Sequence, residues 1–158
     1  MKSEITKLET SATARHATRR NRAWMVDIAR FDLKKHMRPV MMVVDVHSRR
    51  PLSATVSPAI ASAITTTLDR LVQRLGSPAE IWIDRDFELD LALRYWAELH
   101  GIAITFGPML KAKAVTEPIF RDLGAFLRGN LFSTHAELAV GLDKWRQSYA
   151  AAARPLPT

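Results

Sequence analysis

Residues 40–46 have the sequence VMMVVDV, a nearly continuous apolar run that is rich in valine. A short apolar run of this kind predicts a strand that is buried on both faces, inside a sheet. The turn residues Ser48-Arg49-Arg50-Pro51 come next, and an alternating segment from Leu52 to Ser57 follows them. Two such segments joined by a tight turn predict an antiparallel hairpin, from which the rest of the fold can be worked out.

Three further strands are predicted around this hairpin. Trp24 to Phe31 forms the first, and Arg38-Pro39 is expected to break the chain before the hairpin. Ile81-Trp82-Ile83 predicts a short buried strand, and Ile102 to Phe106 alternates as a last strand.

Four helices are predicted from amphipathic spacing and end signals. They extend from Ser57-Pro58 to Gly76, from Phe87 to Gly101, from Pro118 to Gly129, and from a capping box at Thr134 and Glu137 onward. Gly107 to Thr116 is expected to be a loop. The order β-β-β-α-β-α-β-α-α predicts an α/β fold. Its mixed five-stranded sheet has three antiparallel strands followed by two parallel ones, flanked by helices.

The composition limits the classes of protein and of metal site. The 158 residues, with 47% apolar and 25% charged, suit one globular domain, and no apolar run approaches the roughly 20 residues of a membrane span. The chain has no cysteine, and its five histidines are scattered. A bound metal would therefore need oxygen ligands, which favours Mg²⁺ or Mn²⁺ over zinc.

Positive charge is concentrated at the N-terminus. Of the formal net charge of +7, residues 1–22 carry +4. We therefore predict that residues 1–22 form a basic tail or linker and that residues 23–158 form the domain. The charge fits a polyanionic partner such as DNA, and it fits a merely solubilising tail equally well.

Three carboxylates lie at the places where a sheet site would need them. Asp27 interrupts the first strand, Asp84 directly follows a buried strand, and Glu117 precedes the helix predicted from Pro118. A carboxylate at the end of a buried strand is costly unless it is paired or holds a metal. One such residue is usually structural, whereas three at the ends of neighbouring elements indicate a metal site.

Several motifs resemble the catalytic core of DDE transposases and retroviral integrases, in particular the bacterial transposase branch. Trp24-x-x-Asp27 is similar to the family's opening motif, and Arg38-Pro39-Val40 with Asp45 and Ser48-Arg49 is similar to its second-strand motif. The segment from Ile83 to Glu88 resembles the one with the second catalytic aspartate, and 32 residues separate Asp84 from Glu117. The closing Leu138, Leu142, Trp145, Tyr149 and Arg154-Pro155 also match, so the resemblance covers residues 24–155.

This resemblance implies a ribonuclease H-like fold and a polynucleotidyl transferase. Asp27, Asp84 and Glu117 would hold two Mg²⁺ or Mn²⁺ ions, with Asp27 touching both, for DNA end cleavage and strand transfer. Apart from the resemblance, Lys111, Lys113 and Arg121 flank Glu117, where they fit contacts with DNA phosphates and fit ordinary exposed cations somewhat better. The implied partners are transposon ends, target DNA and further copies of the chain. The implied location is the bacterial cytoplasm, associated with the nucleoid and not with a membrane.

Two departures from the family pattern leave an alternative open. Asp86 stands where the family usually has glycine, and Pro118 stands where a basic residue is common. With Pro118 at the helix start, Glu117 would be at the cap. The alternative is an inactive or truncated transposase remnant that acts as a DNA-binding or oligomerisation module, and no flanking end-binding domain is expected in the sequence. A structure-selective nuclease of the same fold is a third possibility.

A hydrolase triad is not expected, although its residue types occur together. Asp45, His47 and Ser48 lie along one strand and its turn, so their side chains should not converge.

Overall fold

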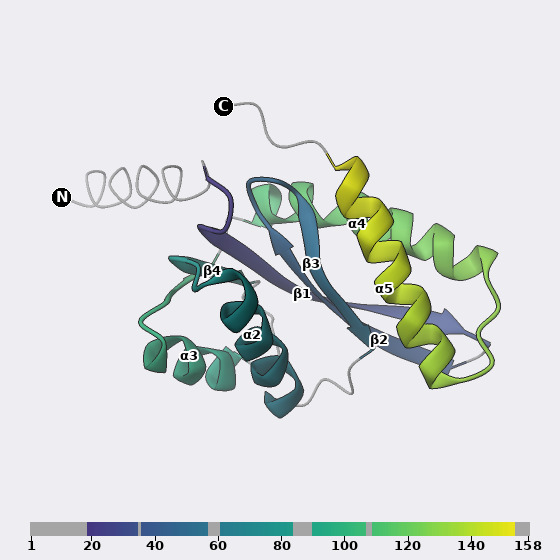
Figure 1. Ribbon diagram of the computed structural model, residues 1–158, viewed down its shortest axis with the longest axis horizontal. Coiled ribbons are helices and arrows are strands. Elements are labelled where there is room, and N and C mark those ends of the chain that lie inside the picture. The colour runs from purple at the N-terminus through teal and green to yellow at the C-terminus, as the bar shows by residue number, and fades with distance from the viewer. Residues whose placement is uncertain (1–18, 35, 57–60, 84–89, 107–108, 154–158) are drawn as a thin grey trace.

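Five strands form one mixed sheet in the order β3-β2-β1-β4-β5. The computed structural model describes residues 19–34, 36–56, 61–83, 90–106 and 109–153. Strands β1 (Ala23–Leu33), β2 (His36–Asp45) and β3 (Arg50–Val56) are antiparallel neighbours. β4 (Glu80–Ile83) and β5 (Ala103–Phe106) run parallel to β1 (Figure 1). The predicted mixed sheet and its strand directions are confirmed.

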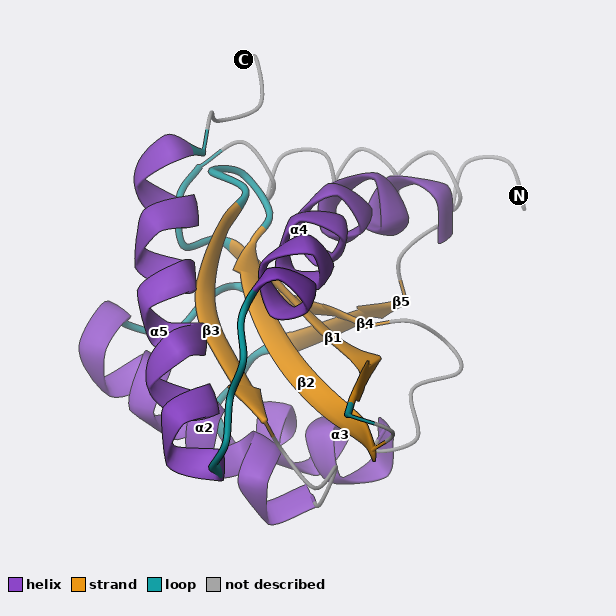
Figure 2. Cartoon of the chain, turned by 90° about the vertical axis from the view of Figure 1, so that its right-hand side faces the viewer, coloured by secondary structure: helices purple, strands orange, loops and turns teal. Residues whose placement is uncertain are grey.

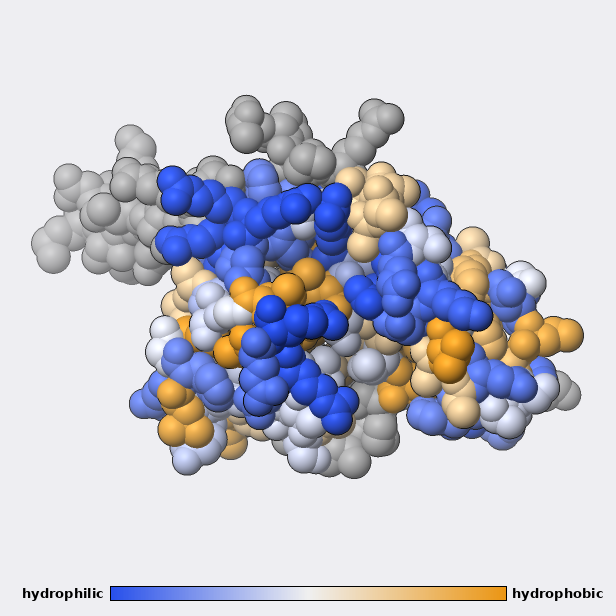
Figure 3. Space-filling model, in the orientation of Figure 1, coloured by the Kyte–Doolittle hydropathy of each residue, from blue (hydrophilic) through white to orange (hydrophobic). Residues whose placement is uncertain are grey.

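Helices cover both faces of this sheet (Figure 2). One face packs against α2 (Ala61–Leu75) and α3 (Asp90–Leu99), through residues such as Leu68 and Trp96. The other packs against α4 (Met109–Gly129) and α5 (His135–Ala152), through residues such as Leu123 and Leu142. None of the described helices is long and apolar enough to cross a membrane. On the face seen in Figure 1, hydrophobic residues form several small groups between hydrophilic ones (Figure 3).

The run at residues 40–44 is fully buried, as its composition predicted. Its side chains alternate, with Val40, Met42 and Val44 in the α4–α5 core and Met41 and Val43 in the α2–α3 core. The expected break at Arg38-Pro39 is wrong, because β2 begins at His36 and Pro39 pairs with Arg30 of β1. β3 pairs with β2 only from Val40 onward, so Pro39 lies where β2 is at the sheet edge among the described residues, and edge strands tolerate proline.

The last helix is fixed by the two features that its sequence indicated. The capping box is present: Glu137 N–H donates to Thr134 Oγ1 at 3.1 Å, and Thr134 N–H donates to Glu137 Oε2 at 3.3 Å. Trp145 is buried, and its Nε1–H donates to Asp122 Oδ1 at 2.7 Å, which ties α5 to α4. Burial and the nearby Asp122 carboxylate raise the pKa of Tyr149, with Arg49 acting in the opposite direction.

Asp45 organises the end of the sheet where β1 begins. It is buried, and its carboxylate accepts hydrogen bonds from the backbone N–H groups of Asn21 and Ser48, both at 2.9 Å, and from the Ser48 hydroxyl. Asn21 in turn donates from Nδ2 to the carbonyl of Leu75, the last residue of α2, at 2.7 Å. Asp45 therefore links three elements and has a structural role.

Replacing Asp45 with alanine should lower the free energy of unfolding by about 3 kcal/mol, because three donors would lose a buried charged acceptor. Asp45→Asn keeps one acceptor oxygen and should lose less. Urea denaturation of both variants gives the measurement. Asp143→Ala is the control, because Asp143 is exposed and its removal should change the stability by less than about 1 kcal/mol. Equal effects of Asp45→Ala and Asp143→Ala would contradict the assignment.

Candidate active site

Asp27 lies in the middle of β1, on the sheet face that α4 and α5 cover. Ala23 and Met25 belong to the α4–α5 core, whereas Trp24 and Val26 belong to the α2–α3 core. Because strand residues alternate between faces, Asp27 follows Met25 on the α4 side. Asp27 is half-buried, whereas residues 23–26 of β1, which precede it, are fully buried. Its Oδ1 accepts a hydrogen bond of 2.8 Å from the Ile28 N–H.

Strand β4 pairs with β1 in parallel and ends at Ile83, one residue before Asp84 in the sequence. Its parallel register pairs Met25 with Trp82, so Val26 and Ile83 come next on the two strands. Ile83 is fully buried and is the last described residue before Asp90. Asp84 itself, and Asp86 after it, lie outside the described residues. The place of Asp84 next to Asp27 therefore stays a prediction.

Glu117 lies inside a helix, and not at a helix cap as its sequence suggested. The predicted loop from Gly107 to Thr116 is wrong for Met109 onward, because α4 runs unbroken from Met109 to Gly129 with Pro118 inside it. The alanine and lysine residues before Glu117 are good helix formers. Val115 and Ile119, which lie on either side of Pro118 in the sequence, are both buried on one face of the helix. Pro118 and Ala114 are both exposed, so water can hydrogen-bond to the carbonyl that Pro118 leaves without a donor.

The packing of α4 on β1 indicates that Glu117 lies on the same side of the Phe120–Phe31 contact as Asp27. Phe120 of α4 lies against Phe31 of β1, with 6.4 Å between ring centroids. Further along, Leu127 and Leu33 line one pocket, so α4 and β1 advance in the same sense. Glu117 precedes Phe120 by one helical turn, and Asp27 precedes Phe31 on the same sheet face. Figure 2 shows α4 lying across this face.

The described residues supply two of the three predicted acids. Asp27 is half-buried and Glu117 is exposed. Across the part of the chain that the structure describes, no three His, Asp or Glu side chains are grouped closely enough to hold a metal ion. A three-acid metal site therefore depends on Asp84.

The three predicted DNA-binding cations belong to α4. Arg121 is exposed one turn after Glu117. Lys111 and Lys113 lie in the first part of α4, whereas they were expected in a loop, and their side chains are outside the described set. Their contact with DNA stays a prediction.

Two acidic residues differ from the sequence interpretation. Asp45 and Ser48 do meet, contrary to expectation, because the turn at residues 46–49 folds Ser48 back onto the carboxylate. Glu80 was missed: it is buried at the start of β4, and the Thr105 hydroxyl donates to its Oε2 at 2.5 Å. The polar partner comes from β5, 25 residues away, so no local pattern could have indicated it.

The sheet order and the two helical layers define a ribonuclease H-like domain, the architecture of integrase catalytic cores. Among solved structures, the core of HTLV-2 integrase in complex with magnesium, in a trimeric form, superposes with a TM-score of 0.62 at 16% identity, covering 81% of this chain and 84% of that one. The BIV integrase core gives 0.59 at 19% identity, covering 77% and 81%. The simian T-cell lymphotropic virus intasome, in complex with the PP2A regulatory subunit B56 gamma, gives 0.60 at 22% identity, covering 77% and 47%.

These likenesses establish the fold and confirm the expectation of a ribonuclease H-like domain. No protein-family profile matches the sequence, and no curated protein sequence matches it.

Replacing Pro118 with alanine tests whether α4 tolerates the proline at a cost. The variant supplies the N–H that can bond to the Ala114 carbonyl, so the free energy of unfolding should rise by about 1–3 kcal/mol. Chemical denaturation followed by circular dichroism measures it. A variant no more stable than the natural chain would show that α4 does not depend on this bond.

Proposed function

We propose that this chain is the catalytic core of a DNA transposase or integrase of the bacterial DDE type. Its reaction would be cleavage at a DNA end, followed by transfer of the freed 3′ strand to target DNA. The observation that carries this proposal is the common side of Asp27 and Glu117 along the β1–α4 contact, in a fold shared with integrase cores. β4 ends one residue before Asp84, which supports a third acid at the same place.

The donor chemistry fits divalent magnesium. Both described acids offer carboxylate oxygens, which Mg²⁺ prefers, and one of them is half-buried at the edge of the core. Asp27, Asp84 and Glu117 would hold the ions, with Asp27 shared. Two bound Mg²⁺ ions would supply charge stabilisation for the attacking and leaving oxygens of an in-line displacement at phosphorus.

The protein's own contribution would be positioning. In cleavage, a water oxygen forms the new bond to phosphorus, the bond from phosphorus to the DNA 3′ oxygen breaks, the water gives a proton to solvent, and the leaving 3′ oxygen takes up a proton to become a hydroxyl. In transfer, the freed 3′-hydroxyl oxygen loses its proton and forms a bond to a target phosphorus, while the bond from that phosphorus to the target strand's 3′ oxygen breaks and the leaving oxygen takes up a proton. Exposed Arg121, and Lys111 and Lys113 on the same helix, would hold the DNA phosphates beside Glu117. DNA and further copies of the chain are the proposed partners, in a bacterial cytoplasm.

The second candidate is an inactive or truncated transposase remnant that serves as a DNA-binding or oligomerisation module. Asp86, in place of the family's usual glycine, favours it because a further negative charge near Asp84 would disturb the site. Pro118 no longer favours it, since Glu117 lies within α4 as the family's glutamate does.

A nicking assay on supercoiled plasmid with Mn²⁺ distinguishes these functions. The natural chain should nick DNA, and Asp27→Asn and Glu117→Gln should each reduce the rate at least about 100-fold, because the metal site contributes several kcal/mol and each 1.4 kcal/mol is tenfold. The controls are Asp143→Asn on α5 and Glu98→Gln on α3, both exposed. Each control should retain full activity.

Calorimetric titration with Mn²⁺ should show binding to the natural chain and weakened binding to Asp27→Asn. No nicking by the natural chain, together with equal Mn²⁺ binding by Asp27→Asn, would establish the inactive module. Joined donor and target strands identify a transposase, whereas hydrolysis alone identifies a nuclease.

A further inference from the structure

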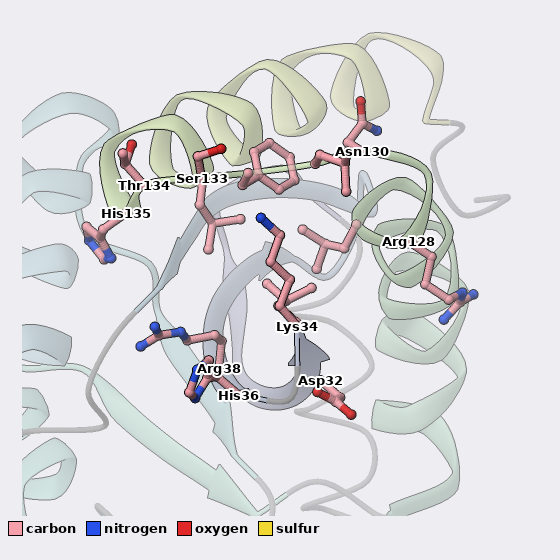
Figure 4. Close-up of a pocket in the computed structure, with 14 residues that line it drawn as sticks. Asp32, Lys34, His36, Arg38, Arg128, Asn130, Ser133, Thr134 and His135 are labelled. Atoms are coloured by element: carbon pink, nitrogen blue, oxygen red, sulfur yellow. The ribbon is translucent and has the colours of Figure 1, made fainter.

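A pocket of about 350 Å³ lies at the C-terminal end of β1, opposite to the end of the sheet that Asp45 organises. The β1–β2 hairpin forms one wall, and the connection between α4 and α5 forms the other (Figure 4). Leu33, Leu127, Phe132 and Leu138 give it an apolar lining. The sequence analysis assigned no DNA-binding role to these residues, and the proposed catalytic acids do not line this pocket.

Three cationic side chains line the pocket, against one carboxylate among the described residues. Lys34, Arg38 and Arg128 line it and are exposed, and within the described residues none of the three is paired with a carboxylate. Figure 4 shows Lys34 extending from the hairpin into the middle of the pocket, whereas Asp32, its one acidic lining residue, points away. The imidazole rings of His36 and His135 also line the pocket. Such a pocket suits an anion.

Phe132 is an aromatic residue of the pocket lining whose ring packs against α5 and Phe126. Phe132 packs on α5 so closely that a Cβ on Gly141 would lie 2.5 Å from its Cε1. Its other neighbour is Phe126, at 5.9 Å between centroids. The ring therefore cannot move toward α5. A fixed aromatic surface next to unpaired cations is the combination that binds single-stranded nucleic acid, because bases stack on the ring and phosphates meet the cations.

We propose that this pocket binds an unpaired nucleotide of single-stranded DNA, with its base against Phe132 and its phosphates on Lys34 and Arg38. The choice of DNA rests on the proposed function, whereas the nucleotide chemistry rests on the pocket. Duplex DNA would present phosphates to the rim, but it keeps its bases stacked and could not fill an apolar pocket. Lys34 is seven residues from Asp27, so a strand held at both places would follow β1 for roughly 23 Å.

The test uses the full chain and two fluorescein-labelled probes, the 12-mer oligothymidylate and a 12-base-pair duplex. Anisotropy titrations in EDTA measure binding without catalysis. The double variant K34Q/R38Q should bind the oligothymidylate about tenfold more weakly, because phosphate contacts are lost. The control K144Q/R70Q removes the same charge from exposed positions outside this pocket, and it should stay within about twofold of the natural chain.

Phe132→Leu separates stacking from charge. It keeps an apolar side chain, and thermal denaturation checks that it folds. It should weaken oligothymidylate binding about fivefold and leave duplex binding unchanged, because only an unpaired base can stack on the ring. Two results would each overturn the proposal: equal losses in the two double variants, or unchanged oligothymidylate binding by Phe132→Leu. Tighter binding of a labelled acidic peptide would also overturn it, in favour of a protein partner.

The two proposals fail separately. If the natural chain binds oligothymidylate in this variant-dependent way but does not nick plasmid, only the catalytic function is refuted. If it nicks plasmid and the pocket variants bind normally, only the nucleotide site is refuted.

Discussion

Burial of residues 23–26 of β1 on both faces of the sheet is the constraint on which the structure depends. β1 pairs with β2 along its whole length and with β4 at its start, so its side chains face one helical layer or the other. The two-residue period then leaves no freedom at Asp27, which must face α4 if Trp24 and Val26 are to fill the α2–α3 core. A shift of β1 by one residue would exchange the side chains that face one helical layer with those that face the other. The packing that stabilises the domain therefore also determines on which face of the sheet the candidate catalytic residue Asp27 lies.

Helix α4 is the second determinant of the site. Its contact through Phe120 and Phe31 sets where Glu117 lies along β1, and its continuation through Pro118 keeps Glu117 on a rigid element. The proline costs less at this position than in a buried helix interior, because the carbonyl that loses its donor belongs to exposed Ala114. Rigid support for an acid is what a metal ligand needs, since its oxygens must stay in place as the reacting phosphate changes shape.

The two ends of the β1–α4 contact differ in charge. Asp27 and Glu117 lie near its middle and beginning, whereas Lys34, Arg38 and Arg128 surround its far end. The acids proposed to bind metal and the cations proposed to bind phosphates are thus separated along β1, which keeps the two sets from neutralising each other. A DNA strand following β1 would meet both.

The sequence by itself determined the strands, most of the helices and the mixed sheet, because short valine-rich runs, two-residue alternation and a capping box are local signals. It also indicated Asp27, since a charge inside an apolar strand is visible without coordinates. It misplaced the start of α4, because a proline that usually begins a helix here lies within one, and only the burial of Val115 and Ile119 on a common face outweighs it. Tertiary structure alone decided that Asp45 meets Ser48 and Asn21, that Thr105 donates a hydrogen bond to buried Glu80, and that the hairpin cations and Phe132 share one pocket. Each of these joins residues through the folded chain, and a pattern in sequence carries no information about such distances until the sheet and its two helical layers are assembled.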